Sequence, residues 1–381
     1  ASLLSGADFW HTKAVERLGV PSVMVSDGPH GLRKQREDGD HLGINESIEA
    51  VCFPTGCATA ASFDRDLIRK IGEAVGDACQ HEKVSVVLGP AVNIKRSPLC
   101  GRNFEYFSED PYLAGEAAVS LIDGVQSRNI GTSIKHFAAN SQEHRRMSSD
   151  SRMDERTLRE IYLPAFEQAV KRAKPWTVMC SYNRLNGVYA SEHPWLLTDL
   201  LRGEWGFDGY VVSDWGAVND RAKGVAAGLD LEMPGSGGVN DRRIVEAVRG
   251  GKLDEKLVDQ AAERVLEVNY RYLENARPET PWDKDAQHAL ARKLAAECMV
   301  LLKNDGLLPL AEGERVAVIG RFAKEPRFQG GGSSHINSFK VTSLIDALGG
   351  APGITYADGY RIDRDDIDEA MIREAVEIAS A

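Results

Sequence analysis

The sequence lacks several features that mark other classes of protein. Its six cysteines are scattered over 381 residues without any C-x-x-C pair, a usage that indicates neither a zinc site nor a disulfide framework. No apolar run approaches the ~18 residues that a membrane helix needs, so we expect no membrane partner. The formal net charge of −11 also predicts no nucleic-acid partner, because nucleic acids bind basic patches on a protein surface.

Motifs for phosphates and metals are missing as well. The glycine-rich run 330–332 follows a predicted strand, yet neither G-x-G-x-x-G nor G-x-x-x-x-G-K-[ST] occurs there. The sequence has no H-E-x-x-H and no Asp-rich calcium loop, and His81 and His144 are isolated. We expect no cofactor and no metal. The cysteine usage favours a reducing, cytoplasmic location, with a signal peptide before residue 1 left open.

What is present is an alternation of two patterns. Short runs rich in Val and Ile, at 22–25, 84–88, 132–134, 177–180 and 209–212, alternate with stretches whose apolar residues recur at helical spacing. None of the runs alternates polar with apolar residues, so they are expected to be strands buried on both faces. Asp64 and Asp110-Pro111 are helix-start signals. The pattern predicts a parallel α/β fold.

Each strand run is followed by a polar cluster, at 26–27, 93–96, 135–136, 181–183 and 213–215. Such clusters are typical of a (β/α)8-like TIM barrel, whose active site gathers at the C-terminal ends of its strands. A doubly wound open sheet also binds ligands at strand ends, so both architectures stay open on this pattern alone.

A break near residue 280 predicts two domains. Arg277-Pro278-Glu279-Thr280-Pro281 ends a long helical pattern. We expect a catalytic barrel over 1–278, a linker over 279–284, and the N-terminal part of an α/β sandwich domain over 285–381. The last stretch, 363–381, is helical where a strand should follow. We therefore expect a truncated C-terminus and a start that lies inside the longer protein.

Asp214 is the strongest single candidate for chemistry. It follows a buried strand and precedes Trp215. A carboxylate in that place either attacks a sugar carbon or caps the next helix. The neighbouring Trp favours the sugar, because the apolar face of a sugar ring stacks on aromatic rings.

Three further motifs have both a functional and an ordinary explanation. Lys135 and His136 enter one pocket only if the backbone departs from extended geometry, since side chains alternate along a strand; otherwise the Lys is solvated and the His is a core residue. Arg102 either donates paired hydrogen bonds to vicinal hydroxyls or makes a surface salt bridge. Asp27, in Asp27-Gly28-Pro29, also fits a simple turn.

Taken together, the motifs resemble glycoside hydrolase family 3, particularly its bacterial β-glucosidases. The resemblance covers nearly the whole chain and depends on several ordered motifs at compatible spacing. These are Leu4-Ser5-Gly6, Ser26-Asp27-Gly28-Pro29-His30-Gly31, Gly101-Arg102-Asn103-Phe104-Glu105, Lys135-His136-Phe137-Ala138-Ala139-Asn140, Ser213-Asp214-Trp215 and Lys303-Asn304-Asp305-Gly306-Leu307-Leu308-Pro309-Leu310.

The resemblance implies a retaining exo-β-glucosidase that removes terminal glucose from a β-glucoside or short β-gluco-oligosaccharide. Asp214 would form the covalent glycosyl-enzyme intermediate. The acid/base would be a Glu of the second domain, in a segment that has no match in this chain, so it is expected outside these residues. Substrate-binding residues implied by the resemblance are Asp27, Arg102, Lys135, His136, Arg146, Met179, Tyr182, Trp215 and Ser334.

Several alternatives remain open. Ala138-Ala139-Asn140 replaces the Pro-Gly-His-Gly loop of the family's N-acetylglucosaminide-cleaving branch, which disfavours that branch. A β-xylosidase or another β-glycosidase is the runner-up, followed by a sugar-binding barrel without turnover and, far below, a phosphate-handling barrel enzyme. A homo-oligomer is also left open.

Overall fold

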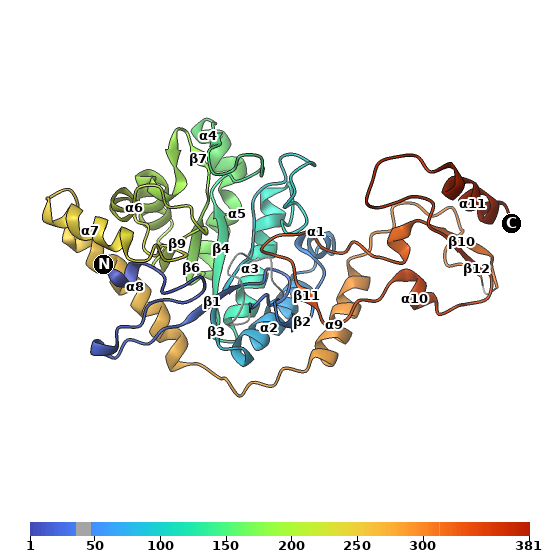
Figure 1. The fold of residues 1–381 in the computed structure, drawn as a ribbon, viewed down its shortest axis with the longest axis horizontal. Coiled ribbons are helices and arrows are strands. Elements are labelled where there is room, and N and C mark those ends of the chain that lie inside the picture. The colour runs from blue at the N-terminus through green and yellow to red at the C-terminus, as the bar shows by residue number, and fades with distance from the viewer. Residues whose placement is uncertain (36–46, 312) are drawn as a thin grey trace. The chain divides into compact units, whose positions relative to one another are not determined.

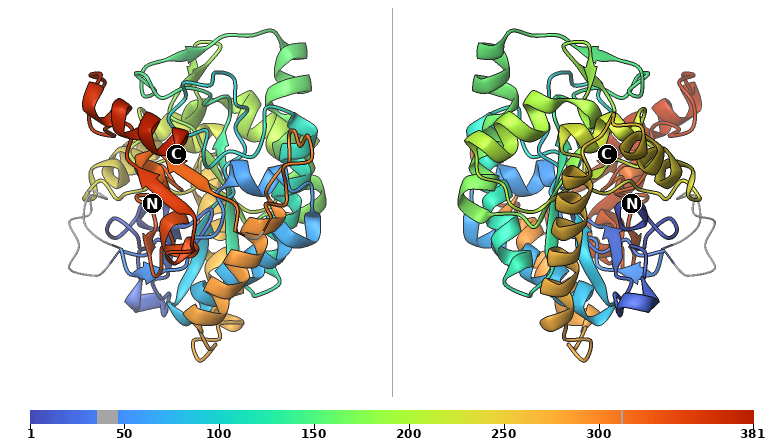
Figure 2. Two further views of the ribbon diagram at one scale, coloured as in Figure 1. Left: turned by 90° about the vertical axis from the view of Figure 1, so that its right-hand side faces the viewer. Right: turned by 90° about the vertical axis from the view of Figure 1, so that its left-hand side faces the viewer.

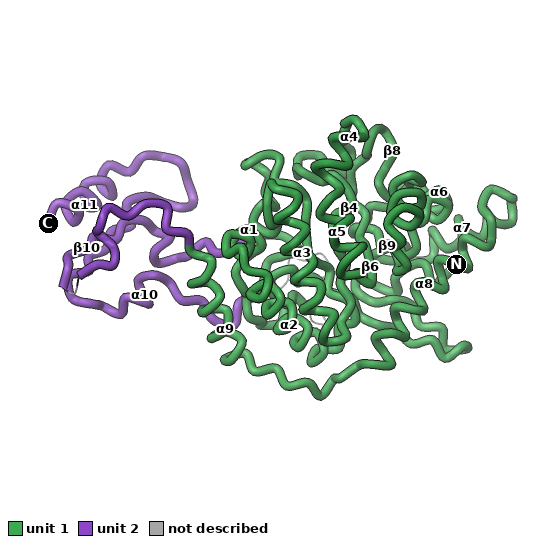
Figure 3. Tube along the Cα trace, turned by 180° about the vertical axis from the view of Figure 1, so that it is seen from behind, with its two compact units in different colours: residues 1–299, 330–337 green, residues 300–329, 338–381 purple. Residues whose placement is uncertain are grey.

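The structure is a computed structural model that describes residues 1–35, 47–311 and 313–381. It forms two units, shown in Figure 3: unit 1 comprises Ala1–Met299 and Gly330–Asn337, and unit 2 comprises Val300–Gln329 and Ser338–Ala381. The sequence pattern predicted a second domain from residue 285. The structure instead groups 285–299 and the segment 330–337 with unit 1.

A five-stranded parallel sheet forms the centre of unit 1 (Figure 1). Its strands follow chain order: β1 (Met24–Asp27), β3 (Val84–Leu88), β4 (Gly131–Phe137), β6 (Thr177–Cys180) and β9 (Tyr210–Ser213). Every residue of these strands is buried. The predicted strands and their burial on both faces are therefore confirmed.

Isolated β-bridges extend the sheet beyond β9 and lead back to β1. They are Val212 with Leu231 and Ser5 with Glu232, both parallel, then Gly6 with Thr12 and His11 with Met24, both antiparallel. The predicted α/β barrel is confirmed as a curved parallel sheet. The barrel does not consist of eight equal strand–helix repeats. Between β9 and β1 the N-terminal segment doubles back instead of contributing a strand and a helix.

Helices surround the sheet in Figures 1 and 2. Two of them begin at the predicted caps: Asp64 Oδ1 accepts from Asp66 N at 2.8 Å, and Asp110 Oδ1 accepts from Tyr112 N at 2.7 Å. The α-helices of unit 1 are α1 (Gly56–Ala61), α2 (Arg65–His81), α3 (Pro111–Gln126), α4 (Glu155–Thr157), α5 (Pro164–Gln168), α6 (Arg221–Ala227), α7 (Val239–Arg249), α8 (Glu255–Glu274) and α9 (Lys284–Glu297).

Shorter elements fill the connections. Leu158–Tyr162, Ala169–Ala173 and Trp195–Glu204 are π-helical, and Ser2–Leu4, Glu16–Leu18, Ala190–Glu192 and Arg321–Ala323 are 3₁₀ turns. The short strands are β2 (Glu49–Ala50), β5 (Asp150–Ser151), β7 (Arg184–Leu185), β8 (Val188–Tyr189) and β11 (Asn337–Ser338).

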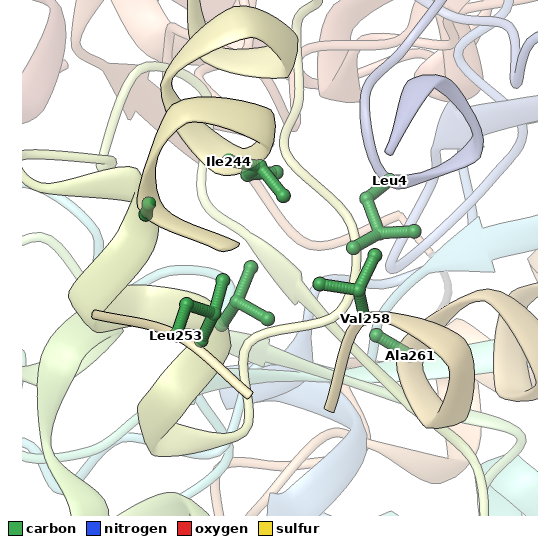
Figure 4. Close-up of a cluster of buried hydrophobic side chains, with 7 residues drawn as sticks. Leu4, Ile244, Leu253, Val258 and Ala261 are labelled. Atoms are coloured by element: carbon green, nitrogen blue, oxygen red, sulfur yellow. The ribbon is translucent and has the colours of Figure 1, made fainter. Parts of the chain in front are cut away.

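An apolar cluster closes the N-terminal side of unit 1 (Figure 4). Leu4 packs there against side chains of α6, α7 and α8, among them Ile244, Val258 and Ala261. This packing anchors the segment that leads into the ring, because buried apolar area is the main stabilising contribution.

Unit 2 contains a two-stranded parallel sheet of β10 (Val316–Ile319) and β12 (Ile354–Ala357), with α10 (Leu344–Leu348) and α11 (Glu369–Ser380). Val316 pairs with Ile354 at the start of the sheet. In the described ranges, no helix has the combination of length and apolar character that spanning a membrane requires.

Candidate active site

The C-terminal ends of the strands surround one cavity of about 450 Å³ in unit 1. It contains every candidate residue predicted from the sequence except Ser334. The lining residues are Phe9, Trp10, Asp27, Arg33, Gly101, Arg102, Lys135, His136, Glu143, Arg146, Met179, Tyr182, Asp214, Trp215 and 331–333.

Asp214 follows β9, and its two carboxylate oxygens have different surroundings. Its Oδ1 accepts a hydrogen bond from the backbone N–H of Trp215 at 2.8 Å, while Oδ2 is buried and has no hydrogen-bond partner among the described residues. Asp214 does not cap the next helix, because Asp220 caps α6. One oxygen of a buried carboxylate is therefore left for a ligand.

The surroundings of Asp214 shift the pKa of its carboxyl in opposite directions. Burial raises the pKa of the carboxyl, and the positive charges of Arg102 and Lys135 oppose that rise. The raised pKa means that the cations do not fully offset the loss of water. They still stabilise the ionised form in which Asp214 can act as a nucleophile.

Asp27 ends β1 and pairs with two cations. Lys135 Nζ lies 3.2 Å from Oδ1, and an Arg33 guanidinium nitrogen lies 3.7 Å from Oδ2. The Arg33 N–H also donates to the Asp27 carbonyl at 2.9 Å, so the chain turns back on itself after β1. Sequence reasoning missed Arg33, which lies in no recognisable motif and reaches the cavity only through this turn.

Lys135 and His136 are adjacent in sequence and both line the cavity. The pairing register of β4 with β6 shifts between Ile134 and Phe137, and the Lys135–His136 peptide bond is cis. The register shift is the predicted departure from extended geometry. Burial lowers the pKa of His136 well below its usual value, and the charges of Arg102 and Lys135 lower it further, so its ring is neutral at neutral pH.

Arg102 is held by a buried carboxylate. Its Nε donates to Glu105, and Glu105 also accepts a hydrogen bond from Ser334 Oγ at 2.5 Å. Burial opposes the ionisation of Glu105, but Arg102 and Lys135 outweigh it and lower the pKa of that carboxyl. Ser334 was predicted to contact the substrate. Ser334 is buried and is not among the residues that line the cavity; it contacts Glu105, which in turn holds Arg102.

A second arginine lies against an aromatic ring. The Arg146 guanidinium is centred 4.3 Å from the Tyr182 ring and donates to Glu143 Oε2 at 2.8 Å. The Tyr182 hydroxyl donates to the Trp215 carbonyl at 2.9 Å, which ties the ring to the segment after β9. Glu143 was not singled out from the sequence, since it lies in a long polar loop without a motif.

Aromatic rings form another wall. The Trp10 and Trp215 rings are 5.5 Å apart between centroids, and the Trp215 indole N–H donates to the Phe9 carbonyl at 2.9 Å. Met179 on β6 is buried and completes the lining. Phe9 and Trp10 were missed because they precede the first predicted strand; two adjacent aromatic residues were their only signal.

The family model for the glycosyl hydrolase family 3 N-terminal domain matches residues 11–268, and the model for the family's C-terminal domain matches residues 299–381. The chain belongs to glycoside hydrolase family 3. Among the family's curated members, thermostable β-glucosidase B of Acetivibrio thermocellus is 58% identical over 386 residues, which span 100% of this chain and 51% of that protein.

Another family 3 relative carries a different name. An exo-α-(1→6)-L-arabinopyranosidase of Bifidobacterium longum is 49% identical and matches 100% of this chain and 52% of its own length. This chain therefore spans about half the length of the curated relatives it matches.

Solved family 3 structures agree with the fold. A β-glucosidase from Bifidobacterium adolescentis superposes with a TM-score of 0.91 at 48% identity, covering 99% of this chain and 54% of that one. β-Glucosidase 3B from Thermotoga neapolitana, solved in complex with α-D-glucose, gives a TM-score of 0.86 at 36% identity, covering 100% of this chain and 54% of that one.

Proposed function

We propose that this chain carries the nucleophile and the sugar-binding residues of a retaining exo-β-glucosidase. One observation carries the proposal: Asp214 presents a buried carboxylate oxygen without a hydrogen-bond partner among the described residues, in a cavity lined by cations and two Trp rings. Cations and carboxylates suit the hydroxyls of a sugar, and aromatic rings suit its apolar face.

The proposed reaction has two displacements. Asp214 Oδ2 attacks the anomeric carbon, the bond to the leaving oxygen breaks, and that oxygen takes a proton from a general acid. Water then attacks the same carbon and gives a proton to the same group, which now acts as the base. The bond between this carbon and Asp214 Oδ2 breaks, and the sugar leaves with retained configuration.

The acid/base is proposed to be a Glu in the part of the enzyme outside this chain. Of the other carboxyl groups that line the cavity, Asp27 is paired with Lys135 and Glu143 is hydrogen-bonded by Arg146. Each is engaged in positioning a cation, a role that suits substrate binding.

Glucose is the proposed sugar. The relatives named β-glucosidase and the glucose complex of a solved family member support it. The arabinopyranosidase relative makes an α-L-arabinopyranoside the second candidate, and a β-xyloside stays the alternative within the class. Comparing kcat/KM of the full-length enzyme on the three nitrophenyl glycosides separates them, because only glucose carries a hydroxymethyl group and the two pentosides differ in the orientation of the 4-hydroxyl.

The nucleophile is tested by incubating the full-length enzyme with an activated 2-deoxy-2-fluoro-β-glucoside and measuring intact mass. We expect one adduct, mapped by peptide analysis to Asp214. Asp214→Asn should form none. Asp220→Asn is the matched control, since Asp220 follows the same strand but caps α6 outside the cavity, and it should be labelled like the wild type.

Absence of an adduct on the folded, full-length enzyme would contradict the glucosidase proposal and favour another sugar or a binding role.

A reducing, cytoplasmic location is proposed on the cysteines alone, which are scattered over the sequence without a C-x-x-C pair.

A further inference from the structure

Asn93 binds the main chain of His136 at two points. It follows β3, and its Nδ2 donates to the His136 carbonyl at 2.9 Å, while its Oδ1 accepts from the His136 N–H at 2.8 Å. Both residues are buried. Reversing the amide would set its oxygen against a carbonyl and its NH₂ against an N–H, so only one orientation satisfies both contacts.

The same oxygen also faces the imidazole. His136 Nδ1 lies 3.1 Å from Asn93 Oδ1. An amide oxygen only accepts, so a hydrogen bond at that distance requires Nδ1 to carry the proton. The ring is neutral and has one proton to place. Nε2 is then an unprotonated acceptor.

Nε2 is the ring nitrogen near the nucleophile. It lies 3.7 Å from Asp214 Oδ2, which is too long for a hydrogen bond. Two lone pairs facing each other do not attract. This arrangement is consistent with the absence of a hydrogen-bond partner at Asp214 Oδ2. The Tyr106 ring packs edge-on to the imidazole with centroids 6.2 Å apart and limits its rotation.

We propose that Asn93 is a positioning residue that holds His136 in its Nδ1–H tautomer. In this state Nε2 accepts a hydrogen bond from a sugar hydroxyl, and Asp214 Oδ2 has no donor attached to it before it attacks. The opposite tautomer would direct an N–H at the nucleophile and occupy it. The consequence for catalysis rests on the proposed glucosidase function, but the tautomer is a property of the free protein.

The charged groups near the ring support the same state. Arg102, Lys135 and Arg146 all disfavour a second proton on His136, and Asp214 is the carboxylate next to it. Burial, together with these cations, keeps the ring neutral, while Asn93 decides which nitrogen holds its proton.

The tautomer is measured by ¹⁵N NMR of the full-length enzyme with labelled histidine, because protonated and bare ring nitrogens have distinct shifts. His136→Gln identifies the signal. We expect a neutral ring protonated at Nδ1. A ring protonated at Nε2, or at both nitrogens at neutral pH, would overturn the proposal even if no variant of Asn93 folds.

Two variants test the role of Asn93. Asn93→Ala should move the proton toward Nε2 and lower kcat by about tenfold, because Nε2–H then faces the charged Asp214 Oδ2 and the attack has to break that hydrogen bond. Asn93→Asp keeps an oxygen facing Nδ1 and should keep Nδ1 protonated, while it loses the donor to the His136 carbonyl and its negative charge raises the pKa of the ring. Asn183→Ala is the control, since Asn183 is a buried amide that binds the Ala138 carbonyl and has no contact with the imidazole.

Glucose and its derivatives test the acceptor role of Nε2 through their inhibition constants. At the hydroxyl that faces His136, replacing OH by F should weaken inhibition as much as replacing it by H, because fluorine cannot donate. Inhibition retained by every fluoro derivative would contradict an accepting Nε2. Failure to trap Asp214 would refute the glucosidase function and leave the measured tautomer standing.

Discussion

Asp214 is buried among cations, and this environment decides at which pH its carboxyl is ionised. Burial raises its pKa, while Arg102 and Lys135 act in the opposite direction. In the proposed mechanism, attack on a sugar carbon needs the ionised form, so activity should fall as the pH drops through the raised pKa. We expect the acid limb of kcat/KM to lie above the ordinary Asp value of about 3.9.

Removing one of the cations should move that limb. Lys135→Met should shift its midpoint upward by about one pH unit, because an opposite charge near a carboxylate lowers its pKa by about that much. The overall kcat/KM also falls, since Lys135 lines the cavity. Lys223→Met removes an equal charge from an exposed site and should leave the midpoint in place. Coincident pH profiles for Lys135→Met and the wild type would contradict this account.

Glu143 lines the cavity but is expected to position Arg146 and not to transfer protons. Glu143→Gln should lower kcat/KM by about tenfold through weaker binding, since one charge-assisted hydrogen bond is lost. The loss should be equal for good and poor leaving groups, and azide should not restore activity. A loss confined to poor leaving groups, with azide rescue, would instead identify Glu143 as the acid/base.

At the scale of elements, the strands could be predicted because burial on both faces leaves a continuous apolar run. The polar residues that follow the strands could be predicted to lie near one another for a second reason. Parallel strands bring their C-terminal ends together. Arg33 and Glu143 could not be found this way. They reach the cavity through loops, and no residue spacing in the sequence predicts the direction in which a loop folds back.

Helices α2 and α3 pack with their backbones in close approach at glycines. A β-carbon at Gly124 would overlap the Arg69 carbonyl oxygen, and one at Gly72 would stand 2.5 Å from the Leu121 carbonyl oxygen. Neither backbone can yield without separating the helices. Gly124→Ala should therefore lower the free energy of unfolding by about 1–3 kcal/mol, measured by urea denaturation.

Gly203→Ala is the matched control for the helix pair. A β-carbon there would meet the Thr198 carbonyl oxygen at 3.5 Å, an ordinary contact. The added methyl should be neutral or stabilise by about 0.5–1 kcal/mol, because it reduces the entropy of the unfolded chain. Equal stability of the two variants would show that the helices can separate without cost.

At the scale of the whole molecule, the sequence predicted two domains but could not show that the segment 330–337 belongs with the first. The segment lies between parts of unit 2 in the chain, yet it packs into unit 1. Ser334 bonds Glu105 there, and Asn337 Nδ2 donates to the Ser47 carbonyl at 3.0 Å. Sequence order alone assigns such a segment to its neighbours, and the range 285–381 expected for the second domain therefore included Ser334.

This placement predicts how sugar binding depends on residues after 299. A protein that ends at Met299 should keep the parallel sheet, whose strands all precede that residue, and should show the circular dichroism of a folded barrel. It should bind glucose more weakly than the full-length enzyme in calorimetry, because 331–333 line the cavity and Ser334 supports Arg102 through Glu105. Ser334→Ala in the full-length enzyme removes only that support and should cost about tenfold in affinity or less, as expected for one hydrogen bond to a charged group. Equal affinity for glucose in all three proteins would show that the segment 330–337 contributes nothing to the site.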